Sequence, residues 1–325
     1  MKCFNAVARM AAVGVLMAIA GSATAQQTYP NSAIRVIVPL APAGSVSILA
    51  RLVSQKLAES WSQQLILDHR PGGNGVIGSE ALIKSPPDGY TILVVTSAHI
   101  INPSLVSTRY DAIKDFAPVA TIASSELILV VHPSVPANDL REFIALAKSK
   151  PGQLNYASTG TGAPTHLAAE SFSILAGVKM QNIPYKGGSP ALTDLIGGQV
   201  QLYFGGVIGV VDHIKAGSVK ALAISGETRF PALPQIPTFS EAGLPGLYAK
   251  YWTGVLAPAG TPKTVINKMS TEIAKILVMP AFREKLAGQG MNPFISTPEQ
   301  FVALMKADLE WYGKIIKTAN IKADQ

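Results

Sequence analysis

Residues 34–52 read IRVIVPLAPAGSVSILARL. Four of the first five are β-branched, which is typical of a buried strand. From Ile48 onward the apolar residues recur at three- and four-residue steps, which predicts a helix. A loop of small residues, 39–47, connects the two. A strand, a short loop and a helix in this order form the repeating unit of an α/β fold.

The same alternation continues along the chain. Strands are expected at 34–38, 65–67, 91–95, 127–131, 201–204, 219–224 and 251–256. Helical spacing is found at 48–57, 143–147, 167–175 and 192–196, and the tail adds helices at 265–277 and 301–316. This pattern predicts an α/β fold with parallel sheets flanked by helices. The helical tail is explained if the chain begins one domain, crosses to build a second and returns to complete the first.

Composition narrows the class of protein. The chain has 325 residues, of which 48% are hydrophobic and 14% charged, so it is too apolar for a disordered protein. This length favours two domains. The net charge is +7, but no run of five basic residues occurs, so we expect no nucleic-acid partner. The single cysteine, Cys3, rules out a disulfide framework and a thiolate metal site.

Residues 1–25 have the pattern of a secretory signal peptide. Lys2 and Arg9 precede an apolar stretch, and Ala23-Thr24-Ala25 provides a small-residue cleavage site. The mature chain is then expected to begin at Gln26. No later segment has about 18 consecutive apolar residues, so we expect a soluble protein in the periplasm.

Three loops rich in small and hydroxyl residues follow strand ends: 39–47, 96–99 and 158–166. In the first, a serine can cap the next helix while the free N–H groups of that helix face an anion. The third offers four hydroxyls and no charge, which suits a carboxylate held by neutral donors. For the first loop the alternative is a plain capped turn, and for the third it is that the hydroxyls only cap the helix.

Motifs that would indicate an enzyme are weaker than these loop features. Residues 73–78, GNGVIG, match a dinucleotide fingerprint, but the next strand ends in Thr96-Ser97 and provides no acid for a ribose. The histidines form no H-E-x-x-H pair, and no G-x-S-x-G motif occurs. His166 could act as a base for Ser158, although a structural hydrogen bond is the favoured role. We therefore expect no catalytic residue, no metal and no cofactor.

Taken in order, several short motifs resemble the Bug proteins, the substrate-binding components of tripartite tricarboxylate transporters. Each motif is weak alone, but their order is specific, and they extend over essentially the whole mature chain. They include IRVIVP at 34–39, RPGGNG at 70–75, PPDGYT at 86–91, DFAPV at 115–119, PYKG at 184–187, EAGLPG at 241–246 and LAPAGTP at 256–262.

The resemblance implies a periplasmic binding protein of type II fold, with two α/β domains around a ligand cleft. Such a protein binds a small carboxylate and presents it to the membrane permease of its transporter. A sensor kinase is a second candidate partner, and we expect a monomer. By position, the resemblance assigns one wall of the cleft to Pro39, Ala43, Gly44, Ser45, Ser47, Thr96, Ser97 and Ala98. It assigns the other to Ser158, Thr159, Gly160, Thr161, Gly162, Thr165, Tyr185 and Gly205.

The sequence departs from the family pattern at two places. The first loop usually contains two or three glycines and an aspartate, whereas this chain has Ala43, Ser45 and Ser47. The turn after the strand at 201–204 often carries an acid or amide, whereas residues 205–209 read GGVIG. Without these acids a ligand ammonium loses its partners. We therefore expect a carboxylate with an apolar body, such as an aromatic acid or a dicarboxylate.

The expected mechanism is hinge closure around the ligand, with chain crossings near Ser125 and Lys250. Domain 1 then comprises residues 26–125 and 250–325, and domain 2 comprises residues 126–249. The alternative function is an exported hydrolase acting on a small ester or amide.

Overall fold

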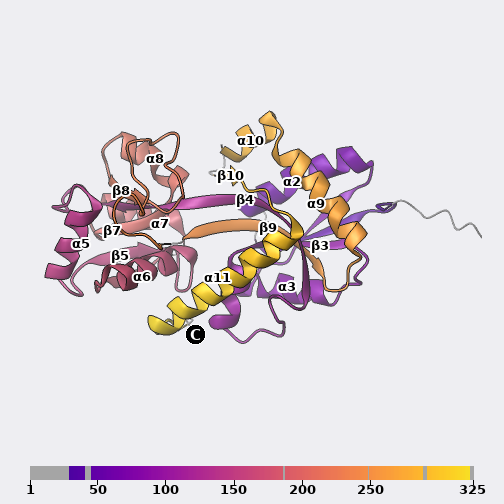
Figure 1. Ribbon diagram of the computed structural model, residues 1–325, viewed down its shortest axis with the longest axis horizontal. Coiled ribbons are helices and arrows are strands. Elements are labelled where there is room, and N and C mark those ends of the chain that lie inside the picture. Colours follow the sequence, from indigo (N-terminus) through magenta and orange to yellow (C-terminus); the bar gives the residue numbers. More distant parts are fainter. Residues whose placement is uncertain (1–28, 41–44, 186, 248, 288–290, 323–325) are drawn as a thin grey trace, which may run out of the picture.

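The computed structural model describes residues 29–40, 45–185, 187–247, 249–287 and 291–322. The expected signal peptide, 1–25, lies outside these residues, as do Ala43 and Gly44. The chain forms two lobes, and two long strands, β4 and β9, run from one lobe to the other (Figure 1).

The elements follow one another in three stages. The first lobe begins with β1 (Ile34–Val38), α2 (Ser45–Trp61), β2 (Leu65–His69), the 3-10 turn η2 (Gly73–Gly75), α3 (Val76–Ile83), β3 (Thr91–Thr96), α4 (Ala98–Ile101) and η3 (Asn102–Ser104). Strand β4 (Phe116–Val131) leads into α5 (Leu140–Ser149), β5 (Asn155–Ser158), α6 (Pro164–Ala176), β6 (Gln181–Pro184), α7 (Gly188–Ile196), β7 (Leu202–Gly206), α8 (Val207–Lys215) and β8 (Lys220–Ile224). The chain returns through β9 (Lys250–Pro258) and ends with α9 (Lys263–Leu277), α10 (Pro280–Ala287), β10 (Asn292–Pro293) and α11 (Pro298–Thr318).

Each lobe contains the predicted parallel strands, and antiparallel crossing strands make the sheet as a whole mixed. Its strand order is β2-β1-β3-β9-β4-β7-β5-β6, with β8 and β10 also pairing with β4. Strand β1 is parallel to β2 and β3, and β5 is parallel to β6 and β7. Strand β9 is antiparallel to β3 and β4, and β4 is antiparallel to β7. The antiparallel pair arises because the chain enters and leaves the second lobe along two neighbouring strands. The α/β class itself is confirmed.

Strand β4 belongs to both parts of the sheet. Its residues 116–126 pair with β9, and from Leu127 onward it pairs with β7 and β8. At the change of partner, Ser125 lies opposite Tyr251 and Glu126 opposite Lys250. The sequence predicted only residues 127–131 as a strand, because polar residues and Pro118 interrupt the β-branched pattern before them.

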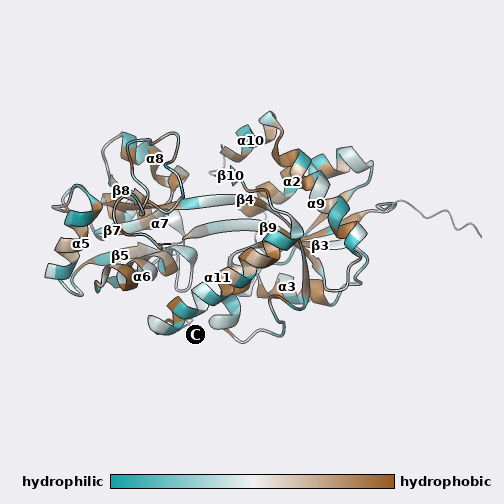
Figure 2. Ribbon diagram, in the orientation of Figure 1, coloured by the Kyte–Doolittle hydropathy of each residue, from teal (hydrophilic) through white to brown (hydrophobic). Residues whose placement is uncertain are grey.

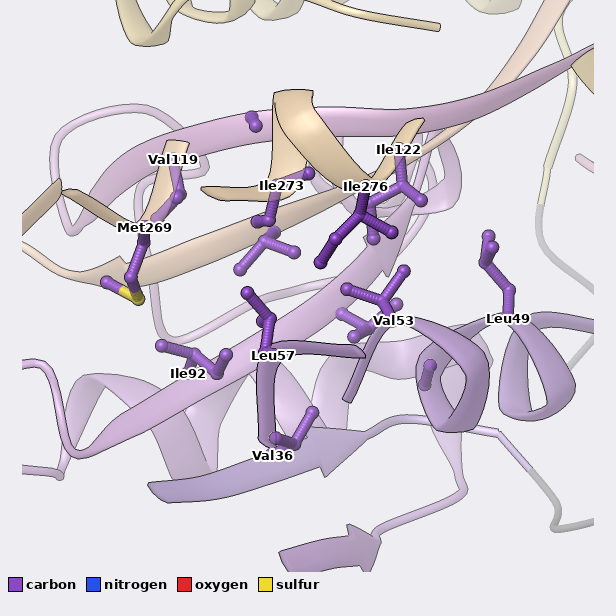
Figure 3. Packing of buried hydrophobic residues seen from close by; sticks show 14 of the residues in the cluster. Val36, Leu49, Val53, Leu57, Ile92, Val119, Ile122, Met269, Ile273 and Ile276 are labelled. Carbon is purple, nitrogen blue, oxygen red and sulfur yellow. The ribbon is translucent and has the colours of Figure 1, made fainter. Parts of the chain in front are cut away.

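Helices α2 and α9 cover one face of the first lobe's sheet (Figure 3). Leu49, Val53 and Leu57 recur every four residues along α2 and so lie on one face of the helix, toward the sheet. Ile273 and Ile276 of α9 pack in the same cluster. Figure 2 shows hydrophilic as well as hydrophobic residues along α9 and α11, as expected for helices with one buried face.

The second lobe has a core on each face of its sheet. Phe143 of α5 and Phe172 of α6 pack with Phe204 of β7 on one face. Leu195 of α7 and Val210 of α8 pack on the other face. Strands β5 and β6 were not predicted, because each is four residues long and contains polar residues in place of a β-branched run.

Helix α11 extends from the first lobe toward the second (Figure 1). Leu167 of α6 belongs to the same buried cluster as Phe301 and Met305 of α11 and Trp252 of β9. The lobes are therefore packed together on this side as well as joined by β4 and β9. None of the helices that the structure describes has both the length and the apolar character needed to span a membrane.

Candidate functional site

The loop at 158–165 connects β5 to α6. Strands β5, β6 and β7 are parallel, so their carboxyl ends lie at one edge of the sheet, where α/β proteins place ligands. The backbone N–H of Thr159 donates to Oγ1 of Thr165 at 2.8 Å, and the two Oγ1 atoms are 3.0 Å apart. The N-cap of α6 is Ala163, which makes no side-chain capping bond. The hydroxyls therefore shape the loop and do not cap the helix at its N-cap position.

The side chain of His166 forms a hydrogen bond with the backbone of this loop. Its Nδ1 accepts a hydrogen bond from the backbone N–H of Gly162 at 2.9 Å, and its Nε2 lies 3.9 Å from Oε1 of Glu170. The hydroxyl of Ser158 donates to the carbonyl of Gly160 at 3.4 Å. Because Nδ1 is occupied by a backbone donor, the histidine has the structural role that the sequence favoured.

Glu170 is itself partly buried beneath the loop. Burial raises the pKa of its carboxyl group, and a hydrogen bond from Tyr156 opposes that shift. The same surroundings raise the pKa of Tyr156, through burial first and the charge of Glu170 second. The base of the loop is thus a buried hydrogen-bonded group that fixes its shape.

The first wall contains Pro39, at the end of β1. A Cβ atom added to Gly78 would lie 2.8 Å from Cβ of Pro39, and one added to Gly75 would lie 3.6 Å from it. The glycines of the GNGVIG motif therefore allow α3 to approach this loop closely. Ser47 is buried in α2, with Oγ 3.5 Å from Nε2 of His69. Of Ser45 the structure describes only the backbone, at the start of α2.

The second loop follows β3. Pro39 and Thr96 line one small cavity with Leu40, Asn74, Ser79 and His99; its volume of about 10 Å³ is close to the smallest that holds a water molecule. The backbone N–H of Ala98 donates to Oγ1 of Thr96 at 3.3 Å. The hydroxyl of Ser97 is fully buried and has no hydrogen-bond partner among the described residues. The structure thus brings Pro39 and Thr96 together.

Sequence reasoning missed an asparagine pair behind this wall. Nδ2 of Asn102 donates to the carbonyl of Asn74 at 3.1 Å, and Nδ2 of Asn74 donates to Oδ1 of Asn102 at 3.3 Å. This pair ties the 73–75 turn to η3. Asn74 has φ of 51° between two glycines, so the G-N-G triplet was a signal that could have revealed a tight functional turn.

Tyr185 forms a hydrogen bond within the second lobe, and Gly205 lies in a strand and not in the expected turn. The Tyr185 hydroxyl donates to Oδ2 of Asp194 at 2.7 Å, and burial raises its pKa to about 12, with this hydrogen bond adding to the shift. The hydroxyl is thus engaged within the lobe. Gly205 lies inside β7, paired with Ile128, and not in a turn, because the strand continues to Gly206. A Cβ atom at Gly205 would lie 2.8 Å from the ring of Tyr203, so this position is one of close packing.

Two contacts connect the loops across the lobes. A Cβ atom at Gly162 would lie 2.3 Å from Cδ1 of Leu105, which follows η3. One at Gly206 would lie 3.8 Å from Oγ of Ser125, at the junction on β4. Within the second lobe, Tyr185 joins the 158–165 loop through its backbone N–H, which donates to the carbonyl of Ser158 at 2.9 Å.

Among the described residues no group of three or more His, Cys, Asp or Glu side chains is placed to hold a metal ion.

Two α/β lobes joined by paired strands, with uncharged loops at their strand ends, define a binding protein of the two-domain periplasmic type. Residues 49–321 match the TctC family, described as the tripartite tricarboxylate transporter family receptor. The chain belongs to this family, and the resemblance to Bug proteins is confirmed. Protein BugT of Bordetella pertussis is 34% identical over 323 residues, which cover 98% of this chain and 99% of BugT.

Solved structures agree with this assignment. A structure described as a periplasmic transporter is 39% identical, with a TM-score of 0.75, and covers 91% of this chain and 100% of its own. An R. palustris protein with adipate is 32% identical, with a TM-score of 0.76 and coverage of 91% and 100%. MatC from Rhodopseudomonas palustris with bound malate is 28% identical, with a TM-score of 0.71 and coverage of 89% and 100%.

Proposed function

We propose that this protein is a periplasmic solute receptor without catalytic activity. It captures a small carboxylate and delivers it to the permease of a tripartite tricarboxylate transporter. The observation that carries this proposal is the loop at 158–165, where hydroxyl and backbone donors without a formal charge gather beside the N-terminus of α6. That N-terminus has no side-chain cap, so its free N–H groups are suited to a carboxylate.

Adipate and malate in two similar structures support a carboxylate as the ligand class. An apolar body on the ligand, in an aromatic or a dicarboxylic acid, fits the absence of acidic side chains from the described parts of the loops at 39–47, 96–99 and 158–165. The wall residues named from the sequence remain the proposed binding set. Thr159, Thr165 and the backbone from Gly160 to Gly162 form its best-defined part.

Capture works by hinge closure. The hinge lies at Ser125 on β4 and Lys250 on β9, where β4 exchanges one set of strand partners for another. The proposed domains meet there, with residues 26–125 and 250–325 on one side and 126–249 on the other. The ligand favours the closed arrangement because it contacts both walls only in that state.

The protein is located in the periplasm, and the signal peptide at residues 1–25 directs its export. The solved structure that is 39% identical to this chain is described as a periplasmic transporter, which supports this location. A monomeric state and a sensor kinase as second partner stay predictions from the sequence.

A thermal-shift screen against mono-, di- and tricarboxylic acids tests the function, followed by titration calorimetry. We expect a rise in melting temperature with one class of acid, and recovery of the bound acid unchanged by mass spectrometry. Absence of any stabilising carboxylate would contradict the receptor. Turnover of an ester or amide would support the hydrolase alternative.

A further inference from the structure

Two short motifs of the first lobe contact each other behind the proposed binding wall. The first is the G-N-G turn at 73–75, and the second is N-P-S-L at 102–105, which forms η3 and the residue after it. Asn74 and Asn102 are joined by two hydrogen bonds, at 3.1 and 3.3 Å, and Asn102 is 2% exposed. A buried amide with hydrogen-bond partners has a defined position. The pair therefore fixes η3 relative to the turn.

The turn itself borders the first wall of the proposed site. Asn74 and Gly75 line the small cavity that also contains Pro39 and Thr96. A Cβ atom at Gly75 would lie 3.6 Å from Cβ of Pro39. The position of η3 is thus set by residues that lie next to this wall.

The chain after η3 places Leu105 against the second lobe. The backbone N–H groups of Leu105 and Val106 both donate to the carbonyl of Asn102, at 2.9 Å. A Cβ atom at Gly162 would lie 2.3, 3.5 and 3.6 Å from Cδ1, Cγ and Cδ2 of Leu105. The whole end of the leucine side chain therefore faces this glycine. Leu105 also packs against the buried cluster that contains Leu167 of α6 and Met305 of α11.

The position of Gly162 matters for the proposed binding set. The N–H of Gly162 donates to Nδ1 of His166 at 2.9 Å, and the N–H of Ala163 donates to the carbonyl of Gly160 at 3.1 Å. These bonds make residues 160–163 one compact turn. A displacement of Gly162 would therefore move the neighbouring backbone, which supplies donors for the proposed carboxylate.

We infer that Leu105 is a positioning residue for ligand binding, although it is outside the proposed binding set. Its contact with Gly162 holds the hydroxyl loop against the first lobe while the ligand is bound, and the Asn74–Asn102 pair keeps Leu105 in place. This inference rests on the proposed receptor function and adds a connection between the two walls besides the ligand. A contact that belongs to the ligand-holding arrangement stabilises that arrangement, so its loss should weaken binding. The loss should appear in the dissociation rate, because the lobes must separate at this contact before the ligand leaves.

The test measures affinity by titration calorimetry and the two binding rates by surface plasmon resonance. The probe is adipate, the acid present in a 32% identical structure, or the acid with the largest thermal shift if adipate gives none. Leu105→Ala should weaken binding about tenfold, because the truncation removes every carbon beyond Cβ from the contact. Dissociation should become faster, and the association rate should change by less than about twofold.

Two further variants serve as controls. Leu105→Met keeps an apolar side chain of similar volume and should restore affinity to within about twofold of wild type. Val106→Ala truncates the next residue, which is 41% exposed, and should change neither rate. Thermal unfolding of each ligand-free variant checks that it is folded.

Asn74→Gly approaches the same contact from the first wall. Glycine accepts the φ of 51°, so the turn keeps its path while the bond from Nδ2 to Asn102 is lost. This variant should also accelerate dissociation, by about threefold, since one neutral hydrogen bond is removed. In the Leu105→Ala background it should have no further effect, because both changes act through one contact.

The inference is overturned if folded Leu105→Ala binds the acid as tightly as wild type or more tightly, or if Val106→Ala weakens binding equally. Slower association with an unchanged dissociation rate, or full additivity with Asn74→Gly, would also overturn it. The receptor function is judged separately by the wild-type protein. If wild type binds a carboxylate, that function stands whatever the variants do, and if no carboxylate binds, both proposals fail.

Discussion

Gly162 of the second lobe lies directly against Leu105 of the first, so closely that a Cβ atom at Gly162 would be 2.3 Å from Cδ1 of Leu105. The backbone of Gly162 has φ of 74° and donates its N–H to His166. The loop at 158–165 is thus held by His166 within its own lobe and by Leu105 of the other lobe.

Gly162→Ala should destabilise the protein for two reasons. A left-handed backbone costs alanine about 1–2 kcal/mol, and the clash with Leu105 adds about 1–3 kcal/mol. Gly152→Ala is the control, because Gly152 has nearly the same φ, 73°, and its Cβ atom would meet no atom within 4 Å. Urea unfolding should show the larger loss for Gly162→Ala, and adding Leu105→Ala should recover part of it. Equal losses for the two alanine variants would contradict the contact.

Thr165→Val should affect both stability and binding. Thr165 is 6% exposed and accepts the N–H of Thr159, so valine leaves that donor without its partner at a cost of about 1–3 kcal/mol. Thr159→Val keeps the hydrogen bond from the backbone N–H of residue 159 to Thr165, so urea unfolding should show a smaller loss of stability for this variant. Both variants should weaken carboxylate binding by about 1–3 kcal/mol in calorimetry. Unchanged affinity in both would remove this loop from the anion site.

His99 should make stability depend on pH. Burial lowers its pKa from 6.5 to about 4, against an opposing hydrogen bond to the carbonyl of Ala112. The unfolded chain therefore binds a proton that the folded protein does not bind between these two values. Stability should be complete above pH 6.5 and fall as the pH drops toward 4, by up to about 3 kcal/mol.

Urea unfolding from pH 7.5 to 4.5 measures this loss. His99→Gln should reduce the slope, and His213→Gln, which removes a different histidine, controls for the substitution. In wild-type protein the ring resonances of His99 should not titrate between pH 7.5 and 5. A titration midpoint near 6.5 would contradict the prediction whatever the variants do.

Trp252 and Asp308 connect a crossing strand to α11. Nε1 of Trp252 donates to Oδ2 of Asp308 at 2.6 Å, and the two residues are 0% and 1% exposed. Asp308→Leu leaves the indole N–H without this acceptor and should cost about 3 kcal/mol, whereas Asp308→Asn retains an acceptor and should cost about 1 kcal/mol. Similar unfolding midpoints for the two variants would show that the bond contributes little.

Short sequence patterns correctly predicted individual strands and the buried faces of helices. The strand at 34–38 and the spacing of Leu49, Val53 and Leu57 were correct, because burial on one face imposes a period that is visible in a short window. Strand direction was not predictable in this way. Strands β4 and β9 are antiparallel because they are neighbours in space, although more than a hundred residues separate them in sequence.

The same limit applies to the site. Hydroxyls at 158–165 were visible as a cluster of donors, but the bond between Thr159 and Thr165 depends on the three-dimensional path of the loop. The hydrogen bonds between Asn74 and Asn102 join residues that are far apart in sequence, so no local pattern revealed them.

A single strand, β4, supplies hydrogen bonds first to one half of the sheet and then to the other. Cutting the molecule into two separately expressed halves would therefore leave an open edge of unpaired peptide groups on whichever half lost its share of that strand. Such an edge invites association between copies, so neither half should survive as a well-behaved fragment. Both lobes depend on the same strand, so we expect them to fold and remain stable only when they are joined in one chain.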